Sequence, residues 1–338
     1  MAAYLVRRLL AATSVVAAVS LAAFVGFGLS LDPSYPLAFV PRKRAVVQAY
    51  YHLQDPILSR YWRWFSGLFH HGFGLTASTD VGGAPLRLQS LGDPIGPALW
   101  HAALVTLALV GLALVFVTVG TGAVGVFAAR RRRLHADVGV RALTYLGTAV
   151  PTFLIGDLLL RVISPHVTAN FVVGRGYVIS STNGWFLIGS PAGGVIGWLR
   201  HLFLPAAALA LGLIGIYARY LRSAMVTELG RPYVTVARAK GLSERRVLVR
   251  HALRNSLVPV TALLTLDLGA VVGGSIAADG VFHTGGLASV FLGGLGHADP
   301  FQLTAIVVVS AIVVCAITLG GDVVVGLLDP RIVSSQRG

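Results

Sequence analysis

Charge and cysteine are both scarce in this chain. Of its 338 residues, 12% are charged and 55% are hydrophobic, whereas an ordinary soluble domain carries about 25% charged residues. Cys315 is the only cysteine, which excludes an intrachain disulfide and a cysteine-based metal cluster. It lies within an apolar run, where a thiol behaves as a small hydrophobic side chain. The composition therefore predicts a chain that lies mostly in a membrane.

Motifs for nucleotide and metal chemistry are also missing. A phosphate-binding loop of the form G-x-x-x-x-G-K-[ST] needs a lysine followed by Ser or Thr, and neither Lys43 nor Lys240 is followed by either residue. No Ser/His/Asp set and no H-E-x-x-H motif occurs at a useful spacing. His70 and His71 are adjacent, so on a helix their side chains diverge by about 100°. We therefore expect no catalytic residue, no metal site and no bound cofactor in this chain.

Long apolar runs are abundant. A helix needs about 20 apolar residues to cross a bilayer. Six stretches reach that length, roughly 9–31, 98–128, 138–163, 201–221, 258–280 and 302–328. The first run, at about 23 residues, exceeds the 7–15 apolar residues of a signal peptide, so we expect a retained anchor. The sequence thus predicts an all-α polytopic membrane protein with six transmembrane helices.

The arginines predict how these helices are oriented. Basic residues concentrate in cytoplasmic loops, and with the N-terminus inside, 18 of the 27 Lys and Arg residues fall on the cytoplasmic side. Most of the others lie in one long loop, where charge influences topology little. Both termini are therefore predicted to be cytoplasmic, and the net charge of +14 requires no nucleic-acid partner.

The spacing of the spans predicts two regions. Residues 1–97 would hold the first helix and an extracytoplasmic region, and residues 98–338 would form a five-helix core. Within the external region, residues 44–70 can be helical, and their aromatic side chains are numerous enough to pack as a small unit or to lie on the membrane. Three segments with closely spaced glycines are expected to be external loops: 72–96, 164–200 and 281–300.

One basic segment interrupts the apolar runs. Residues 233–259 contain a single acid, Glu244, and six basic residues: Arg238, Lys240, Arg245, Arg246, Arg250 and Arg254. Residues 234–240 contain no helix breaker, Gly241 interrupts them, and Ser243 is well placed to cap a second helix with Glu244 in its first turn.

The second helix of this segment has two predicted faces. The apolar stripe would contain Leu248, Val249, Ala252 and Leu253, beside a basic row formed by Arg246, Arg250 and Arg254. The segment therefore predicts a helix–turn–helix hairpin at the membrane face. By itself, the pattern is equally typical of a basic loop attracted to anionic lipid.

The residues of the hairpin carry a specific resemblance. They include Tyr233, Val234, Ala237, Arg238, Ala239, Lys240, Gly241, Leu242, Arg250, His251, Ala252, Leu253, Arg254, Asn255 and Pro259. This set resembles the cytoplasmic "EAA" loop of binding-protein-dependent ABC importer permeases, in the branch that transports peptides and nickel. The Glu for which the motif is named is Thr235 here, and its first Ala is Val236. Weaker similarity extends from Tyr4 to Arg331, and the opening resembles the subunit type with a long first external loop.

The resemblance implies a fold, a function and a set of partners. The fold would be the type I ABC importer permease fold, and the chain would be a transport subunit rather than an enzyme, in the bacterial plasma membrane. Its partners would be a second homologous permease, two ABC ATPase subunits or one fused ATPase that bind ATP and Mg, and an extracytoplasmic substrate-binding protein. The expected cargo is a di- or oligopeptide, with nickel or another small solute as the alternative.

The resemblance also implies which residues couple transport to ATP hydrolysis. The coupling loop would extend over residues 222–257. Its coupling residues would be Tyr233, Ala237, Arg238, Ala239, Lys240, Gly241, Leu242, Arg246 and Arg250.

Acidic residues within the predicted spans are candidates for the translocation path. A charge at the bilayer centre costs about 2.5–3.5 kcal/mol on insertion scales, so such residues face a cavity or a partner. Asp267, near the middle of the fifth predicted span, either lines the path and attracts a cationic group such as a peptide amine, or hydrogen-bonds a neighbouring helix. Asp279 is a second candidate for the path, and Asp157 with Arg161 predicts an internal pair at i and i+4.

Two other classes of membrane protein compete with the importer interpretation. A secondary transporter without an ATPase should show inverted repeats and broken helices around a midplane site, and the sequence contains no clear internal repeat. A membrane-anchored sensor or scaffold would explain the basic loop, but not six spans with intramembrane acids.

Overall fold

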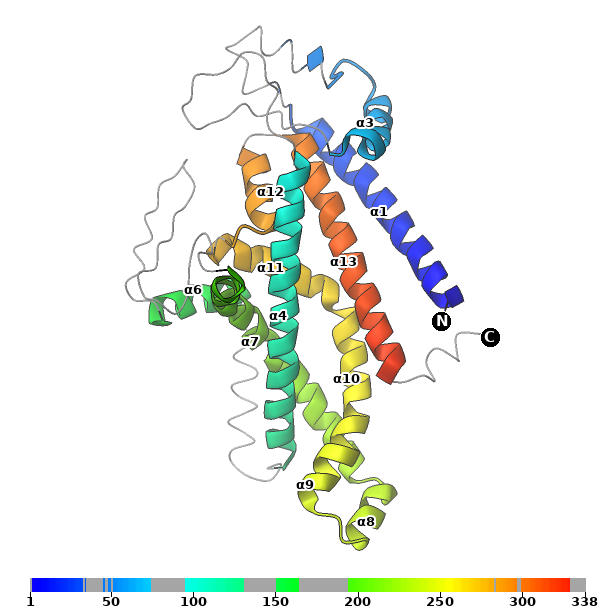
Figure 1. The fold of residues 1–338 in the computed structure, drawn as a ribbon, viewed down its shortest axis with the longest axis vertical. Helices are drawn as coiled ribbons and strands as arrows, with labels where there is room; N and C mark the ends of the chain where they lie inside the picture. Colours follow the sequence, from blue (N-terminus) through cyan, green and yellow to red (C-terminus); the bar gives the residue numbers. More distant parts are fainter. Residues whose placement is uncertain are drawn as a thin grey trace. The chain divides into compact units, whose positions relative to one another are not determined.

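The computed structural model describes most of the predicted spans. The described residues are 2–32, 34, 45, 48–49, 51–73, 95–130, 150–163, 194–282, 284–296 and 299–328. Their regular structure is entirely helical (Figure 1). The helices are α1 (Ala2–Ser30), α3 (Ile57–His71), α4 (Ile95–Arg130), α6 (Thr152–Ile163), α7 (Gly194–Leu229), α8 (Pro232–Ala239), α9 (Glu244–Arg246), the π-helix η2 (Val247–Leu253), α10 (Arg254–Leu266), α11 (Leu268–Phe282), α12 (Leu287–Gly296) and α13 (Pro300–Leu328).

Four of these helices are long and apolar enough to cross a membrane. They are Val6–Ser30 in α1, Ile95–Arg130 (α4), Gly197–Leu229 in α7 and Pro300–Val324 in α13. The helical stretches on either side of Asp267 form a fifth span if they are taken together, bent by 59°. The predicted span 138–163 lies largely outside the described residues, which include only its end in α6. The count of six spans and the cytoplasmic termini stay predictions.

The chain divides into two compact units. Unit 1 contains Met1–Thr106 and Gly285–Ala316, and unit 2 contains Leu107–Thr284 and Ile317–Gly338. The predicted boundary between residues 97 and 98 stays a prediction.

Aromatic side chains hold unit 1 together. Phe24 of α1 is only 3% exposed, and its ring centroid lies 5.6 Å from those of Tyr61 and Trp64 in α3 and 5.9 Å from that of Phe301 in α13. Edge-on and tilted ring pairs at such distances are favourable. The helix expected somewhere within residues 44–70 is thus present as α3, and two of its aromatic side chains, Tyr61 and Trp64, pack on Phe24 of α1.

The segment 281–300 was expected to be a loop because of its glycines, but it contains the helix α12. Gly285 (φ 76°) makes the turn before that helix, and the Thr106 hydroxyl accepts a hydrogen bond from the Leu287 N–H at 3.0 Å. Gly294 allows close packing, because a Cβ there would lie 3.2 Å from Leu303 of α13. In this segment, Gly285 therefore forms a turn, and Gly294 allows α12 and α13 to pack closely.

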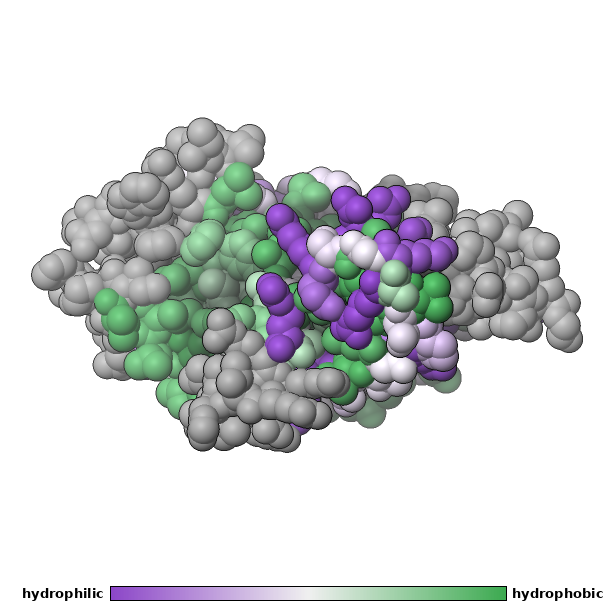
Figure 2. Space-filling view, turned by 90° about the horizontal axis from the view of Figure 1, so that it is seen from below, coloured by the Kyte–Doolittle hydropathy of each residue, from purple (hydrophilic) through white to green (hydrophobic). Residues whose placement is uncertain are grey.

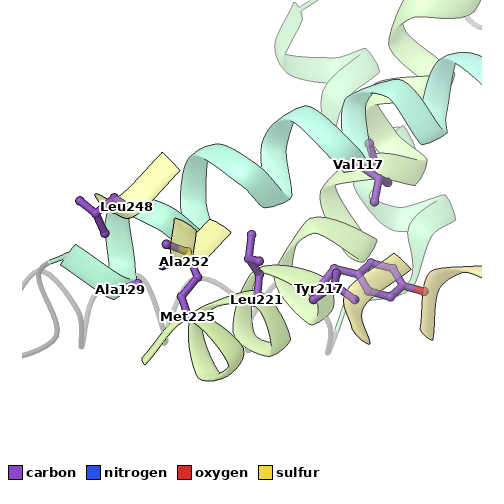
Figure 3. Packing of buried hydrophobic residues seen from close by; sticks show 9 residues of the cluster. Val117, Ala129, Tyr217, Leu221, Met225, Leu248 and Ala252 are labelled. Carbon is purple, nitrogen blue, oxygen red and sulfur yellow. The ribbon is translucent and has the colours of Figure 1, made fainter. Parts of the chain in front are cut away.

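Unit 2 contains an apolar cluster built by four helical elements (Figure 3). Its buried members are Val117 and Ala129 of α4; Ala210, Tyr217, Leu221 and Met225 of α7; Leu248 and Ala252 of η2; and Val260 of α10. Small residues let the helices approach closely: a Cβ on Gly125 of α4 would lie 2.9 Å from Leu221. Close approach over small residues is a main source of helix association in membranes.

Candidate functional site

The basic segment forms the predicted helix–turn–helix hairpin. We define the hairpin as residues 232–253, which comprise α8, the turn after it, α9 and η2. It joins the end of α7 to the start of α10 (Figure 1). Seen from the end of the molecule where α8 and α9 lie, hydrophilic residues gather over the hairpin (Figure 2). The hairpin thus presents a polar surface while both of its ends continue into membrane-spanning helices.

A small apolar core holds the two arms of the hairpin together. Val234 and Ala237 of α8 are buried against Val247 of η2, with Leu229 and Leu242 packed at the edge of this cluster. Because Val234 and Ala237 are three residues apart, they share one face of α8 and leave the rest of that helix to solvent. Ala237, one of the predicted coupling residues, is therefore part of the hairpin core.

The turn after α8 is a Schellman motif. Gly241 has φ 76°, and its N–H donates to the Arg238 carbonyl at 2.9 Å, while the Leu242 N–H donates to the Ala237 carbonyl at 3.3 Å. These are the two bonds that define the motif, and the apolar contact of Leu242 with the cluster around Ala237 completes it. The local sequence Lys-Gly-Leu thus has a structural reason: only glycine adopts this φ without strain.

An ion pair bridges the turn. Arg238 Nε lies 2.6 Å from Glu244 Oε1, and Nη2 lies 3.3 Å from Oε2, so the guanidinium binds the carboxylate in a bidentate manner. This hydrogen bonding raises the pKa of Arg238 and lowers the pKa of Glu244. The predicted side-chain cap by Ser243 is absent: Ser243 holds the N-cap position, but only its backbone carbonyl bonds the helix, accepting from the N–H groups of Arg246 and Val247.

Tyr233 connects the hairpin to both membrane-spanning helices that flank it. Its hydroxyl donates to Glu228 Oε2 of α7 at 2.6 Å and accepts from Asn255 Nδ2 of α10 at 3.0 Å. Burial raises the pKa of Tyr233, and the hydrogen bond to Glu228 raises it further, so the hydroxyl remains protonated at neutral pH. One side chain therefore ties α7, α8 and α10 together.

The prediction of the apolar stripe on the second arm of the hairpin, which α9 and η2 form, is partly wrong. Leu248 and Ala252 are buried as expected, but Val249 is 52% exposed and Val247 is fully buried in its place. The reason is η2, whose hydrogen bonds run from i to i+5 and so rotate successive side chains differently from an α-helix. As a result, Val247 faces the core of the hairpin while Leu248 faces the cluster of unit 2.

A groove of about 340 Å³ opens between α7 and α10 beside the Tyr233 contact. Its wall includes both Glu228 and Asn255. Pro259, in the same wall, has no N–H and cannot make the helical hydrogen bond to the carbonyl of Asn255. The groove therefore lies beside the turn of α10 that lacks the backbone hydrogen bond between residues 255 and 259.

The acids within the spans have polar neighbours. Asp267 stands between α10 and α11, and its Oδ2 accepts a hydrogen bond of 2.8 Å from the buried Tyr217 of α7. Asp267 thus hydrogen-bonds a neighbouring helix, which is one of its two predicted roles. Its role in the translocation path stays a prediction. Asp279 is 2% exposed and accepts from Thr284 Oγ1 at 2.5 Å. The predicted partner of Asp157, the Arg161 side chain, lies outside the described side chains, as do those of His70 and His71.

The predicted coupling residues fall into two groups. Ala237 and Leu242 hold the hairpin core, as described above. Exposed positions are Tyr233, Arg238, Ala239, Lys240, Gly241, Arg246 and Arg250. The sequence did not identify Glu228, Asn255 and Tyr217 as partners, because the relevant contacts join residues 5, 22 and 50 positions apart in three different helices. Only the isolated position of Glu228 at the end of an apolar run was a signal.

Comparison with known proteins places this geometry in context. The family described as "Binding-protein-dependent transport system inner membrane component" matches residues 121–334. The chain is 32% identical to the oligopeptide transport system permease protein OppB of Mycobacterium tuberculosis (strain ATCC 25618 / H37Rv), over 98% of this chain and 99% of OppB. It is 30% identical to the dipeptide transport system permease protein DppB of Bacillus subtilis (strain 168), with both chains fully covered.

A solved structure shares the fold. A chain of the inward-facing MetNI methionine ABC transporter superposes with a TM-score of 0.53 at 19% sequence identity, covering 70% of this chain and 99% of that one. At this identity the similarity concerns the fold alone.

Proposed function

Because the chain belongs to the family of binding-protein-dependent transport system inner membrane components, we propose that it is the permease subunit of an ATP-driven importer of di- or oligopeptides. The observation that carries the proposal is the hairpin, a polar segment continuous with two apolar helices. Seven of the nine residues expected to couple transport to ATP hydrolysis are exposed on it, and the other two, Ala237 and Leu242, hold its core. Relatives over the full length of the chain are oligopeptide and dipeptide permeases, which favours a peptide over nickel.

The permease acts within a larger assembly. A second homologous permease subunit completes the membrane part, and an extracytoplasmic binding protein delivers the cargo. Two ABC ATPase subunits, or one fused ATPase, bind ATP and Mg on the cytoplasmic side of the bacterial plasma membrane. The chain itself is the transport subunit and leaves hydrolysis to those partners.

The hairpin transmits the movement of the ATPase. It sits in a surface groove of one ATPase subunit, where the exposed residues Arg238, Lys240, Arg246 and Arg250 make the contact. Closure of the ATPase pair around nucleotide displaces the hairpin. Because Tyr233 binds residues of both α7 and α10, the displacement reaches both spans together and alternates access to the path. The packed core around Val234 and Val247 lets the hairpin move as one body.

The translocation path contains Asp267. Asp267 is exposed on a stretch that is long and apolar enough to span the membrane, and a charge that faces lipid at that depth is unfavourable. The face of the bent span that carries Asp267 therefore borders the path. There the carboxylate of Asp267 attracts the amino group of a peptide. Asp279, which is buried, supports the wall of the path at the end of α11.

Co-purification tests the proposal. A tagged chain, gently extracted from its native membrane, is expected to bring down an ABC ATPase and a second permease. The isolated assembly should hydrolyse ATP faster when the binding protein and a peptide are added. A preparation that transports peptide in proteoliposomes without any ATPase would overturn the proposal in favour of a secondary transporter.

A further inference from the structure

The helix α3 has a wider apolar surface than it uses in packing. One part of this surface faces α1: Tyr61 shares a hydrogen bond of 2.8 Å with Ser20, its ring lies 5.6 Å from Phe24, and Ile57 comes within 3.2 Å of a Cβ placed on Gly28. The adjacent part is open, since Leu58 is 64% and Trp62 is 67% exposed.

The open part is a continuous stripe. Leu58, Trp62 and Phe65 follow one another at i, i+4 and i+7, which places them on one face of α3. The rings of Trp62 and Phe65 stack with their centroids 6.2 Å apart. The polar side of the helix differs: Arg63, next in sequence to Trp62, turns to an ion pair of 2.5 Å with Asp55. The helix thus separates an apolar face, on which Leu58 and Trp62 are exposed, from a charged one.

The contacts with α1 fix how deep α3 lies. Ile57 meets Gly28 and Tyr61 meets Ser20, so α3 runs antiparallel along the last turns of α1 (Figure 1). Ile57 is thus level with Gly28, two residues before Ser30. Tyr61 lies one turn further along α3, at most about 6 Å deeper, and reaches Ser20 with its hydroxyl. A helix at that depth next to a span borders the lipid rather than bulk water.

We propose that Leu58, Trp62 and Phe65 form a lipid-binding face that anchors α3 in the outer boundary of the bilayer, at the acyl chain and headgroup level. Amphipathic helices with Trp and Phe on the apolar face and Arg on the polar face lie in this layer, and Trp is enriched there in membrane proteins. The occupant is phospholipid. The competing occupant, the extracytoplasmic binding protein, would instead have to cover a face that lies beside a membrane-spanning helix.

Nitroxide labels on the full chain test the proposal. In a Cys315→Ser background, single cysteines replace Trp62 or Leu58 on the proposed lipid face and Arg63 on the polar face, and the assembly is reconstituted in phosphatidylcholine and phosphatidylglycerol vesicles. Spin relaxation is measured with oxygen, which dissolves in lipid, and with a water-soluble nickel chelate. We expect a severalfold higher ratio of oxygen to nickel accessibility at positions 58 and 62 than at 63.

Two results would overturn the proposal. Equal ratios at 62 and 63 would show that the face meets water. Protection of positions 58 and 62 from both reagents would show that protein covers them, and loss of that protection on removal of the binding protein would identify it as the occupant. The readout needs no transport activity, so it is independent of whether the importer function holds.

Discussion

At the scale of single residues, the Arg238–Glu244 pair allows the stability of the hairpin and its function to be separated. Both side chains are substantially exposed, and an exposed ion pair is worth about 0.2–1 kcal/mol. We expect Arg238→Glu to leave membrane insertion unchanged and to lower the melting temperature only slightly, because the lost ion pair and the new repulsion with Glu244 are both at an exposed position. The same change reverses a charge on the coupling surface, so peptide-stimulated ATPase activity of the assembled importer should be lost.

The double variant Arg238→Glu/Glu244→Arg is the matched control. It restores an ion pair across the turn but keeps the reversed charge at position 238. If Arg238 contacts the ATPase, the double variant stays uncoupled. Recovery of stimulated ATPase activity would show that the pair only maintains the geometry of the turn.

The shifted pKa of Glu244 sets the sign of a pH effect. Because this pKa is lowered in the folded protein, the ion pair contributes stability above the ordinary Glu value of about 4.3 and loses it as the pH falls through the lowered value. The melting temperature of the wild type should therefore exceed that of Glu244→Gln by a constant amount between about pH 6 and pH 8, and the difference should vanish in strong acid. A difference that grows on acidification would contradict this assignment.

At the scale of elements, the turn at Gly241 gives a graded series of variants. A Cβ there would meet nothing within 4 Å, so Gly241→Ala introduces only the backbone strain of φ 76°, about 1 kcal/mol. Asn tolerates this φ better and should be milder. Proline cannot adopt it and also removes the N–H that bonds Arg238, so Gly241→Pro should abolish coupling.

The variants are compared by their peptide-stimulated ATPase activity, at equal amounts of assembled importer. The expected order is wild type, Asn, Ala and Pro, from highest to lowest. If Gly241→Pro inserted normally and coupled as well as the wild type, the Schellman turn would be unimportant for the function of the hairpin.

Helix packing in unit 2 offers a second comparison between neighbouring glycines of α4. An alanine Cβ at Gly125 would lie 2.9 Å from Leu221, which is fully buried, whereas one at Gly122 would meet nothing within 4 Å. Overpacking costs about 1–3 kcal/mol. Gly125→Ala should therefore lower the melting temperature in detergent, while Gly122→Ala should leave it unchanged or raise it. The reverse order would show that the two helices do not pack as described.

Local patterns predicted the hairpin better than they predicted its packing. The uninterrupted run before Gly241 gave the first arm to within two residues of α8 (Pro232–Ala239), because breakers and glycines with positive φ act locally. The exposure of Val249 was missed, since the π-helix η2 turns Val247 and Leu248 toward two different clusters. Nothing in the sequence Val-Leu-Val-Arg-His-Ala-Leu distinguishes a π-helix from an α-helix.

At the scale of the whole molecule, two hydrogen bonds join α7 to the span formed by α10 and α11. The hydroxyl of Tyr233 links α7 to α10 near the hairpin, and the hydroxyl of Tyr217 links α7 to Asp267 at the bend. Between these two links α10 covers 13 residues, about 20 Å of helix. In the proposed mechanism, a displacement of the hairpin would therefore reach the bend through both helices. These long-range links were beyond sequence patterns, because they depend on how the helices pack.

The link at the bend also separates the charge of Asp267 from its structural role. Asp267→Asn removes the charge but keeps an oxygen that accepts the Tyr217 hydrogen bond, whereas Tyr217→Phe removes the hydrogen bond and keeps the charge. If the carboxylate attracts the amino group of the cargo, Asp267→Asn should slow peptide uptake about tenfold, equivalent to about 1.4 kcal/mol of lost attraction, and Tyr217→Phe should mainly lower stability. Uptake is compared in proteoliposomes at equal assembly. Unchanged uptake kinetics in Asp267→Asn would leave Asp267 with its helix contact alone and remove it from the path.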